Sequence, residues 1–333
     1  MRRPPAGVFF EPPGAADAPL ALHELRSWPG LPTHAGTRLV RGRLTVHEQV
    51  PASGGWDYVL LAVQPNQVEE AARLSLPLLG ERGVLVCFQN GLCEERVAPI
   101  VGKDRVIGGV IAWGASSPFP GVYERTSAGG FTLGTLPGGP DDRVGALQRV
   151  LEGGGAVELT GNLAGVRWSK LALNCAISSL GTIGGDRLGS LLVQRFVRRL
   201  ALEVMTEVVL VAKAEQIKLE KVAGTLDLEW IALTDSERAA DLGSPSLFTK
   251  HSLLLAVGAR YRRLRSSMLA AIERGKEPPV DFLNGEVTMR AARHGLKAPV
   301  NQRILETVKA LARHELKSGM PALRKLYDET REP

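Results

Sequence analysis

Two short, uninterrupted apolar runs in the first half of the chain limit the fold more than any other feature. They are YVLLAV at 58–63 and GVLVCF at 83–88, and both are rich in β-forming residues. A run of this length without polar alternation is typical of a strand that is covered on both faces of a parallel sheet. Between the two runs, residues 68–80 have helical spacing, which Pro77 and Gly80 end. A strand, a helix and a strand in this order predict an α/β domain.

The same alternation continues to about residue 160, and then it stops. We expect strands at 105–114 and 156–160, a helix at 141–154, and a hairpin formed by 121–126 and 129–134. Beyond Asn162 every apolar pattern has the helical period. The predicted helices are 164–180, 191–215, 251–275, 280–295 and 300–316. The sequence therefore predicts an α/β domain over residues 1–161 and an all-helical domain over residues 162–333.

Composition excludes several classes of protein. Of the 333 residues, 44% are apolar and 23% are charged, which is ordinary for a globular protein and unlike a disordered or fibrous chain. No apolar run reaches the ~20 residues of a membrane helix, and the apolar stretch at the start is too short for a signal peptide. We therefore expect a cytoplasmic protein without a membrane partner.

The cysteines, histidines and basic residues suggest neither a metal site nor a nucleic-acid site. The three cysteines, Cys87, Cys93 and Cys175, are expected to be free thiols, and Cys87 and Cys175 lie in apolar surroundings. The six histidines lack the helical spacing of metal ligands, so no metal is expected. The net charge is +6, and its densest basic run is RYRRLR at 260–265. A solvated helix face is favoured there over a nucleic-acid surface.

One helix carries a polar stripe on an otherwise apolar surface. Lys170, Asn174 and Ser178 are spaced i, i+4 and i+8 within the predicted helix 164–180, so they share one face. One interpretation is a solvated outer face. The other is a boundary between the two domains at which the three groups meet a polar ligand. The period by itself leaves both interpretations open.

Two further segments deserve comparison with this stripe. QNGL at 89–92 directly follows a buried strand, at the carboxyl edge of the sheet where ligands of open α/β folds bind. Asn-Gly is also simply a favourable turn. The segment 266–287 begins with two serines before an apolar helix and continues through a Gly/Pro-rich loop. Asp281 in that segment is the expected N-cap of the next helix.

Taken together, these blocks resemble the ketopantoate reductase (2-dehydropantoate 2-reductase) family. The resemblance runs from about residue 57 to 310 and rests on DYVLLAVQPNQV, CFQNGL, VRWSKLALNCAISSL, RSSMLAAIERG and VDFLNGEV…HGLKAPVN. It implies a Rossmann-type parallel sheet followed by a helical substrate domain. It also implies NADPH-dependent reduction of a branched 2-oxo acid such as ketopantoate, with a homodimer as a possible assembly.

The resemblance also implies roles for individual residues. Lys170 matches the catalytic lysine of the family. The residues matched to substrate binding are Asn174, Ser178 and Ser267. The residues matched to the cofactor site are Gln64, Asn90 and Ala115. An ammonium group beside a carbonyl can stabilise the negative charge that hydride transfer leaves on oxygen, and it can supply the proton.

The sequence departs from the family at its beginning and at several site positions. The motif G-x-G-x-x-G, which follows the first strand in the family, does not occur, and residues 6–11 are similar to the second strand. The parallel sheet is therefore expected to be incomplete. Glu11 ends that segment where the family tends to have a basic residue, and Pro279 stands where it usually has an acidic one. The alternative to a reductase is a related scaffold that binds a ligand or a partner without hydride transfer.

Overall fold

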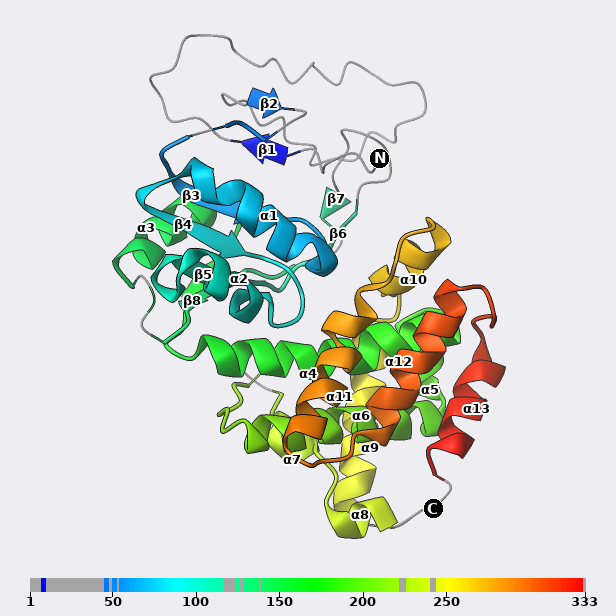
Figure 1. Ribbon diagram of the computed structural model, residues 1–333. Coiled ribbons are helices and arrows are strands. Elements are labelled where there is room, and N and C mark those ends of the chain that lie inside the picture. Colours follow the sequence, from blue (N-terminus) through cyan, green and yellow to red (C-terminus); the bar gives the residue numbers. More distant parts are fainter. Residues whose placement is uncertain are drawn as a thin grey trace, which may run out of the picture.

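The structure, a computed structural model, has a sheet-containing part followed by a helical part (Figure 1). It describes residues 7–9, 45–47, 50–52, 54–116, 124–125, 128–137, 139, 141–221, 226–239 and 244–331. Within these ranges, no helix combines the length and the apolar character that a membrane crossing needs.

The main sheet has five strands and is mostly parallel, as predicted. Its strand order is β3 (Trp56–Leu61), β4 (Leu79–Cys87), β5 (Val106–Ile111), β8 (Phe131–Thr135) and β9 (Val157–Leu159). Only the β5–β8 pair is antiparallel. Because the first three strands run in the same direction, their carboxyl ends lie along one edge of the sheet.

The predicted hairpin between 121–126 and 129–134 is wrong. The short strand β7 (Glu124–Arg125) pairs with β6 (Ala115–Ser116), and β8 pairs with β5 and β9 instead. A position between two strands satisfies both edges of β8, whereas a local hairpin would satisfy only one.

Within the segment 6–11, which resembles the second strand of the family, the described residues 7–9 do not pair with the main sheet. Strand β1 (Gly7–Phe9) forms a separate antiparallel pair with β2 (Thr45–His47). Glu11 lies outside the described residues.

Alternate residues of β4 pack on opposite faces of the sheet, as the uninterrupted apolar run predicts. Leu85 and Cys87 pack with residues of α1 (Val68–Ser75) and α2 (Cys93–Val101). Val84 and Val86 pack on the other face with α3 (Asp141–Leu151). All four side chains are fully buried, so both faces of this strand belong to a core.

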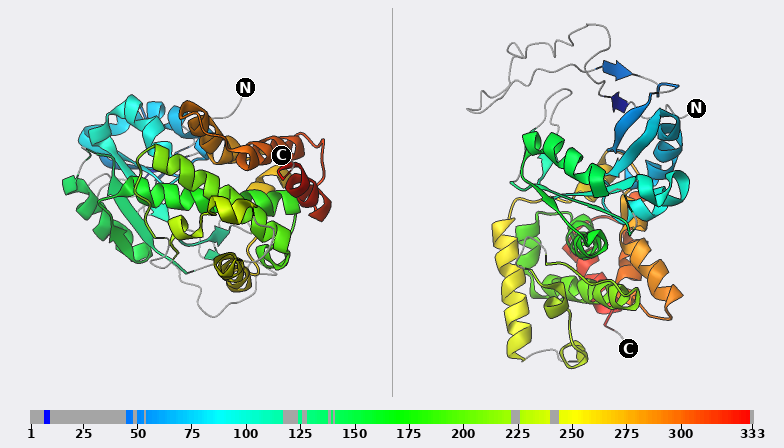
Figure 2. Two further views of the ribbon diagram at one scale, coloured as in Figure 1. Left: turned by 90° about the horizontal axis from the view of Figure 1, so that it is seen from below. Right: turned by 90° about the vertical axis from the view of Figure 1, so that its left-hand side faces the viewer.

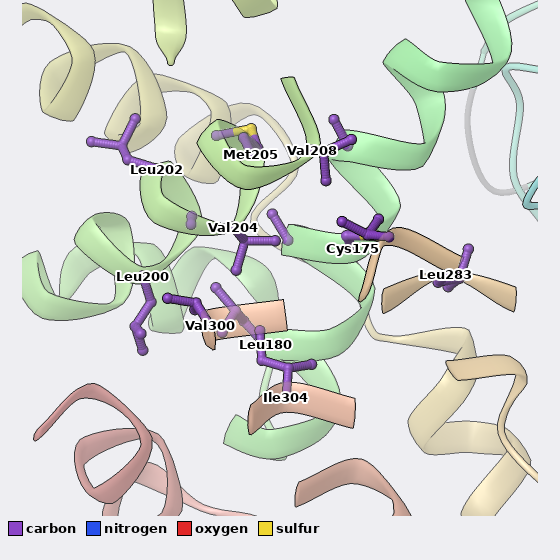
Figure 3. Packing of buried hydrophobic residues seen from close by; sticks show 14 of the residues in the cluster. Cys175, Leu180, Leu200, Leu202, Val204, Met205, Val208, Leu283, Val300 and Ile304 are labelled. Carbon is purple, nitrogen blue, oxygen red and sulfur yellow. The ribbon is translucent and has the colours of Figure 1, made fainter. Parts of the chain in front are cut away.

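The helical part is built around two long helices, α4 (Leu163–Gly184) and α6 (Arg195–Ala214). The helices around them are α5 (Leu188–Val193), α7 (Leu228–Ile231), α8 (Asp235–Ala239), α9 (Pro245–Arg260), α10 (Ser267–Glu273), α11 (Asn284–Arg293), α12 (Pro299–Ala312) and α13 (Met320–Glu329). Figure 3 shows Cys175 and Leu180 of α4, Met205 of α6 and Ile304 of α12 packed into one core. Cys87, Cys93 and Cys175 are buried free thiols, as expected.

The predicted helix 251–275 is two helices. Helix α9 ends at Arg260, and α10 starts after Ser266, whose hydroxyl accepts a hydrogen bond from the amide of Leu269. This N-cap starts a new helix and turns the chain. Residues 260–265 are exposed, but beyond Arg260 they form a turn rather than the predicted helix face.

Helix α4 begins directly after the sheet and lies beneath it in Figure 1, and Figure 2 shows the sheet-containing part seated on the helical part. Strand β9 ends at Leu159, and the side chain of Asn162 accepts a hydrogen bond from the amide of Gly165 to cap α4. The predicted division after residue 161 falls in this turn, and we propose it as the domain boundary.

Candidate active site

Lys170 connects the first long helix to the edge of the sheet. It lies on α4, and its Nζ donates a hydrogen bond of 2.9 Å to the carbonyl oxygen of Ile111, the last residue of β5. The side chain is half-buried. The carboxyl ends of parallel strands are where ligands of open α/β sheets bind. The ammonium group therefore lies at the edge of the sheet and is directed away from bulk solvent.

The surroundings of Lys170 favour loss of its proton. Burial, and to a smaller extent the nearby positive charge of Arg167, lower the pKa of Lys170 from 10.5 to about 7. An acid whose pKa lies near the working pH can both donate and recover a proton readily. This lysine is suited to proton transfer at neutral pH.

A buried ion pair fixes the start of α4 against β4. Arg167 forms a salt bridge with Glu94, and both side chains are buried. Its guanidinium also donates to the carbonyl oxygens of Gln89 at 2.7 Å and of Cys87 at 2.8 Å. The sequence prediction missed this pair. The available signal was an arginine three residues before Lys170 on an apolar helix.

Two further ion pairs connect α2 to α11. Glu95 pairs with Arg290 at 2.6 Å, and Arg96 pairs with Glu286 at 2.6 Å. Together with Glu94, three consecutive residues of α2 therefore contact the helical part. These contacts fix the sheet edge relative to Lys170.

Asn174 offers an unused donor one turn after Lys170. It is half-buried, and its Nδ2 is buried with no hydrogen-bond partner among the described residues. A buried polar atom without a partner is costly, so such atoms are rare and suggest a missing ligand or water. The polar stripe is thus not a solvated outer face.

The third residue of the stripe meets α10. The carbonyl oxygen of Ser178 accepts a hydrogen bond of 2.8 Å from the hydroxyl of Ser266, which also lies 2.8 Å from the hydroxyl of Thr182. Ser266 is buried, and its neighbour Ser267 is exposed at the first position of α10. These bonds fix Ser267 beside α4. The sequence prediction singled out Ser267 and not the residue that positions it.

The three residues matched to the cofactor site follow three successive strands. Gln64 follows β3, Asn90 follows β4 and Ala115 follows β5, and all three are exposed. None of them forms a hydrogen bond with Lys170 in the part of the chain that the structure describes. Gln64, Asn90 and Ala115 therefore lie at the same edge of the sheet as Lys170 but make no polar contact with it among the described residues.

The turn after Asn90 requires glycine for two reasons. Gly91 has a φ of +91°, and a Cβ atom there would lie 2.6 Å from the carbonyl oxygen of Phe282. The turn therefore packs closely on the short helix Pro279–Phe282 of the helical part. A side chain at this position would push the two parts of the molecule apart.

The prediction that Asp281 caps the next helix is wrong. Its carboxylate pairs with Lys309 of α12 at 2.6 Å, and α11 begins after Leu283 without a side-chain cap. The short helix at Pro279–Phe282 takes the place of the extended approach that an N-cap needs. Glu277 is exposed.

The structure fits the reacting end of a nicotinamide dinucleotide better than its pyrophosphate. The orphaned Nδ2 of Asn174 and the ammonium of Lys170 give a polar site at the sheet edge. By contrast, the first turn of α1, after β3, contains Glu69 and Glu70, and the first turn of α2, after β4, contains Glu94 and Glu95, which already pair with Arg167 and Arg290. Acidic side chains at a helix N-terminus oppose a bound phosphate. The described residues hold no cluster of His, Cys, Asp or Glu able to bind a metal.

Comparison with known proteins agrees with this architecture. The family described as ketopantoate reductase PanE/ApbA matches residues 32–138, and its C-terminal domain matches residues 162–312. The 2-dehydropantoate 2-reductase of Pyrococcus horikoshii is 27% identical over 256 residues, which cover 76% of this chain and 75% of that protein.

Solved structures share the fold. A PanE/ApbA family ketopantoate reductase from Ralstonia eutropha JMP134 superposes with a TM-score of 0.63 at 23% identity, over 79% of this chain and 78% of that one. A D-mandelate dehydrogenase in complex with NADH and anilino(oxo)acetate gives a TM-score of 0.64 at 18% identity, over 78% and 77% of the two chains. With residues 32–138 and 162–312 matched by the two models of the family and its fold shared, the chain belongs to the ketopantoate reductase family.

Proposed function

We propose that this protein is a nicotinamide-dependent oxidoreductase that reduces the keto group of a 2-oxo acid, with ketopantoate as the substrate and NADPH as the cofactor. The name of the Pyrococcus horikoshii relative supports the substrate. The observation that carries the proposal is the half-buried Lys170, whose Nζ lies at the carboxyl end of β5 and whose pKa is about 7.

Lys170 is the proposed catalytic residue. When bound, the reduced nicotinamide supplies the hydride. The ammonium of Lys170 donates a hydrogen bond to the substrate carbonyl oxygen, where negative charge develops in the transition state, and then transfers its proton to that oxygen. The Ile111 carbonyl, which accepts from Nζ at 2.9 Å, holds the ammonium at the sheet edge between turnovers.

Three residues are proposed to bind the substrate. The free Nδ2 of Asn174 is a donor for a carboxylate or hydroxyl oxygen of the 2-oxo acid. Ser178 and Ser267 extend the polar surface beyond it, since Ser266 links the backbone of Ser178 to the start of α10. For a branched substrate, the apolar side chains between these polar groups would contact the alkyl portion.

Gln64, Asn90 and Ala115 are proposed to hold the nicotinamide end of the cofactor, because each is exposed at the end of one of three successive strands. The preference for NADPH over NADH rests on the family resemblance. The pyrophosphate has no suitable helix N-terminus after β3 or β4, since both first turns are acidic.

A steady-state assay tests the proposal. The full chain is mixed with NADPH or NADH and with ketopantoate or other branched 2-oxo acids, and loss of the reduced nicotinamide absorbance is followed. We expect turnover with the wild-type protein and a roughly 10²–10³-fold lower kcat for Lys170→Ala, as for other single oxyanion donors. Lys213→Ala, which alters an exposed lysine at the end of α6, is the matched control and should keep full activity.

The second candidate function is a binding scaffold without hydride transfer. The acidic first turns of α1 and α2, and the absence of G-x-G-x-x-G from the sequence, favour it. It predicts no turnover with either nicotinamide at millimolar concentration. In that case the reductase proposal is wrong for this chain.

A further inference from the structure

A cavity of about 620 Å³ lies where the start of α6 meets α9 and α13. In Figure 1, α13 lies on the side of the helical part away from the sheet, so this cavity is separate from the candidate active site. Four arginines and one histidine line it, and none of the lining residues in the described part of the chain is acidic. Its volume suits a small organic ligand, and its charge favours an anion.

His251 provides a buried polar atom without a partner. Only 8% of the residue is exposed, and its Nδ1 makes no hydrogen bond among the described residues. Burial lowers the pKa of His251 to about 4, and the charges of Arg198, Arg195 and Arg199 act in the same direction. The imidazole is therefore neutral, and because His251 lines the cavity, the imidazole edge that borders it can present an N–H to an oxygen atom of a bound anion.

Arg324 offers a guanidinium that the described residues do not use for hydrogen bonds or ion pairs. It stacks on the ring of Phe196 at 3.7 Å and lies 5.7 Å from the ring of Tyr327. Stacking fixes the plane of the guanidinium and leaves its N–H edge available. A guanidinium oriented in this way is well suited to a phosphate group.

The N-terminus of α6 adds backbone donors. Gln194 is the N-cap, and its side chain accepts no hydrogen bond from the first turn. Gln194, Arg195 and Phe196 line the cavity, so the first turn of a 20-residue helix borders it. The first amides of a helix lack partners within the helix, and its dipole favours negative charge there.

Arg199 forms a fixed wall of the cavity. Its guanidinium pairs with Glu203 at 2.8 Å and donates to the backbone carbonyls of Glu237 and Arg238. Since Glu203 compensates its charge, Arg199 is not one of the groups on which the attraction for an anion depends.

We propose that this cavity is a binding site for a phosphate-bearing small molecule, held by His251, Arg324 and the first turn of α6. Donors from three separate elements border one space, which matches the several acceptor oxygens of a phosphate better than the two of a carboxylate. The volume leaves room for a sugar-sized group beside the phosphate. The site is independent of the proposed reductase activity.

Isothermal titration calorimetry on the full chain at low salt tests this site. The probes are inorganic pyrophosphate and ribose 5-phosphate, with ribose as the uncharged control, and none of them contains adenine or nicotinamide. We expect saturable binding of a phosphate probe and none of ribose. Tighter binding of ribose 5-phosphate would identify a sugar phosphate as the ligand, and tighter pyrophosphate would identify a free inorganic anion.

Variants locate the binding. His251→Leu and Arg324→Gln should each weaken binding at least tenfold, because each removes a direct contact to the anion. Arg274→Gln removes an exposed arginine in the loop after α10 and should leave affinity unchanged. Arg324 is exposed, so its variant tests the site even if His251→Leu does not fold. No saturable binding, or an equal loss in Arg274→Gln and Arg324→Gln, would overturn the proposal.

Discussion

Replacing Lys170 by methionine should make the protein more stable in acid and less stable in base. The pKa of Lys170 falls from 10.5 to about 7 on folding, because burial disfavours its charged form. The difference, 10.5 − 7, is about 3.5, and each whole step in pKa corresponds to ~1.36 kcal/mol. Keeping this lysine charged in the folded protein therefore costs up to about 5 kcal/mol.

The sign of the effect follows from proton binding. Between about pH 7 and 10.5 the unfolded chain holds a proton on Lys170 that the folded protein has released. The stability of the wild-type protein therefore rises with pH across this window. Below about pH 7 both states are protonated, and the full cost of the buried charge is present. Above about pH 10.5 neither state is protonated, and the cost vanishes.

Methionine removes that cost, but it also removes the hydrogen bond to the carbonyl of Ile111. The lost bond is worth ~1 kcal/mol. Lys170→Met should therefore be about 2–4 kcal/mol more stable than the wild-type protein near pH 6 and about 1 kcal/mol less stable near pH 10.5. Its reductase activity should fall with that of Lys170→Ala, because a group that destabilises the fold is retained for its chemistry.

Urea unfolding at a series of pH values measures the difference between the two proteins. Lys213→Met, at an exposed position of α6, is the control, and its difference from wild type should not vary with pH. A constant difference between Lys170→Met and wild type across the whole range would refute the reasoning. It would mean that Lys170 has the same pKa in the folded and unfolded states.

Four further outcomes are expected. Because protonated Lys170 is the proposed proton donor, kcat for reduction of the 2-oxo acid should fall as pH rises through about 7. In the reverse direction, kcat for oxidation of the hydroxy acid should rise over the same pH range. Matching pH profiles in both directions would exclude this role. Asn174→Leu should raise KM for the 2-oxo acid about tenfold or more without loss of stability, since its Nδ2 has no partner to lose; kinetics and a thermal melt check this. Arg167→Met should lower the free energy of unfolding by about 3–5 kcal/mol, because it leaves Glu94 buried and unpaired. Adding Glu94→Leu should restore most of that stability in urea unfolding. Equal losses in the single and double variants would contradict this prediction. NADPH should bind the full chain with a Kd near millimolar, because the sequence has no G-x-G-x-x-G turn, and losing about 4 kcal/mol of charge-assisted bonds to the pyrophosphate weakens binding roughly a thousandfold. A micromolar Kd in calorimetry would show that another segment supplies these bonds.

Local pattern determined the class of each half of the chain. The run at 83–88 lacks polar positions, and both faces of β4 are buried as expected. The run at 58–63 also forms a strand, but the expectation that both of its faces are covered is wrong, because β3 lies at the edge of the sheet and Leu60 is 38% exposed. The run at 83–88 made the parallel sheet and the buried thiol of Cys87 predictable, and the apolar helical pattern around Cys175 made the burial of that thiol on α4 predictable. The helical half was predictable because its apolar period persists from about residue 162 onward. The stripe of Lys170, Asn174 and Ser178 was visible for the same reason, since helical spacing alone places three residues on one face.

Tertiary contacts decided what local pattern left open. Whether the stripe faces solvent or the sheet depends on the Ile111 carbonyl, which lies 59 residues away in sequence. The partners of β8 depend on which strand edges remain unpaired once the sheet assembles, so β8 pairs with β5 and β9 and does not form the predicted local hairpin. The carboxylate of Asp281 forms an ion pair with Lys309 of α12 and does not cap the helix that follows it. The pairing of Arg167 with Glu94 joins segments 73 residues apart, and no local period encodes it. Burial and charge pairing act between segments that only the folded chain brings together. Burial, with the nearby charge of Arg167, also sets the pKa of Lys170, on which the proposed chemistry depends.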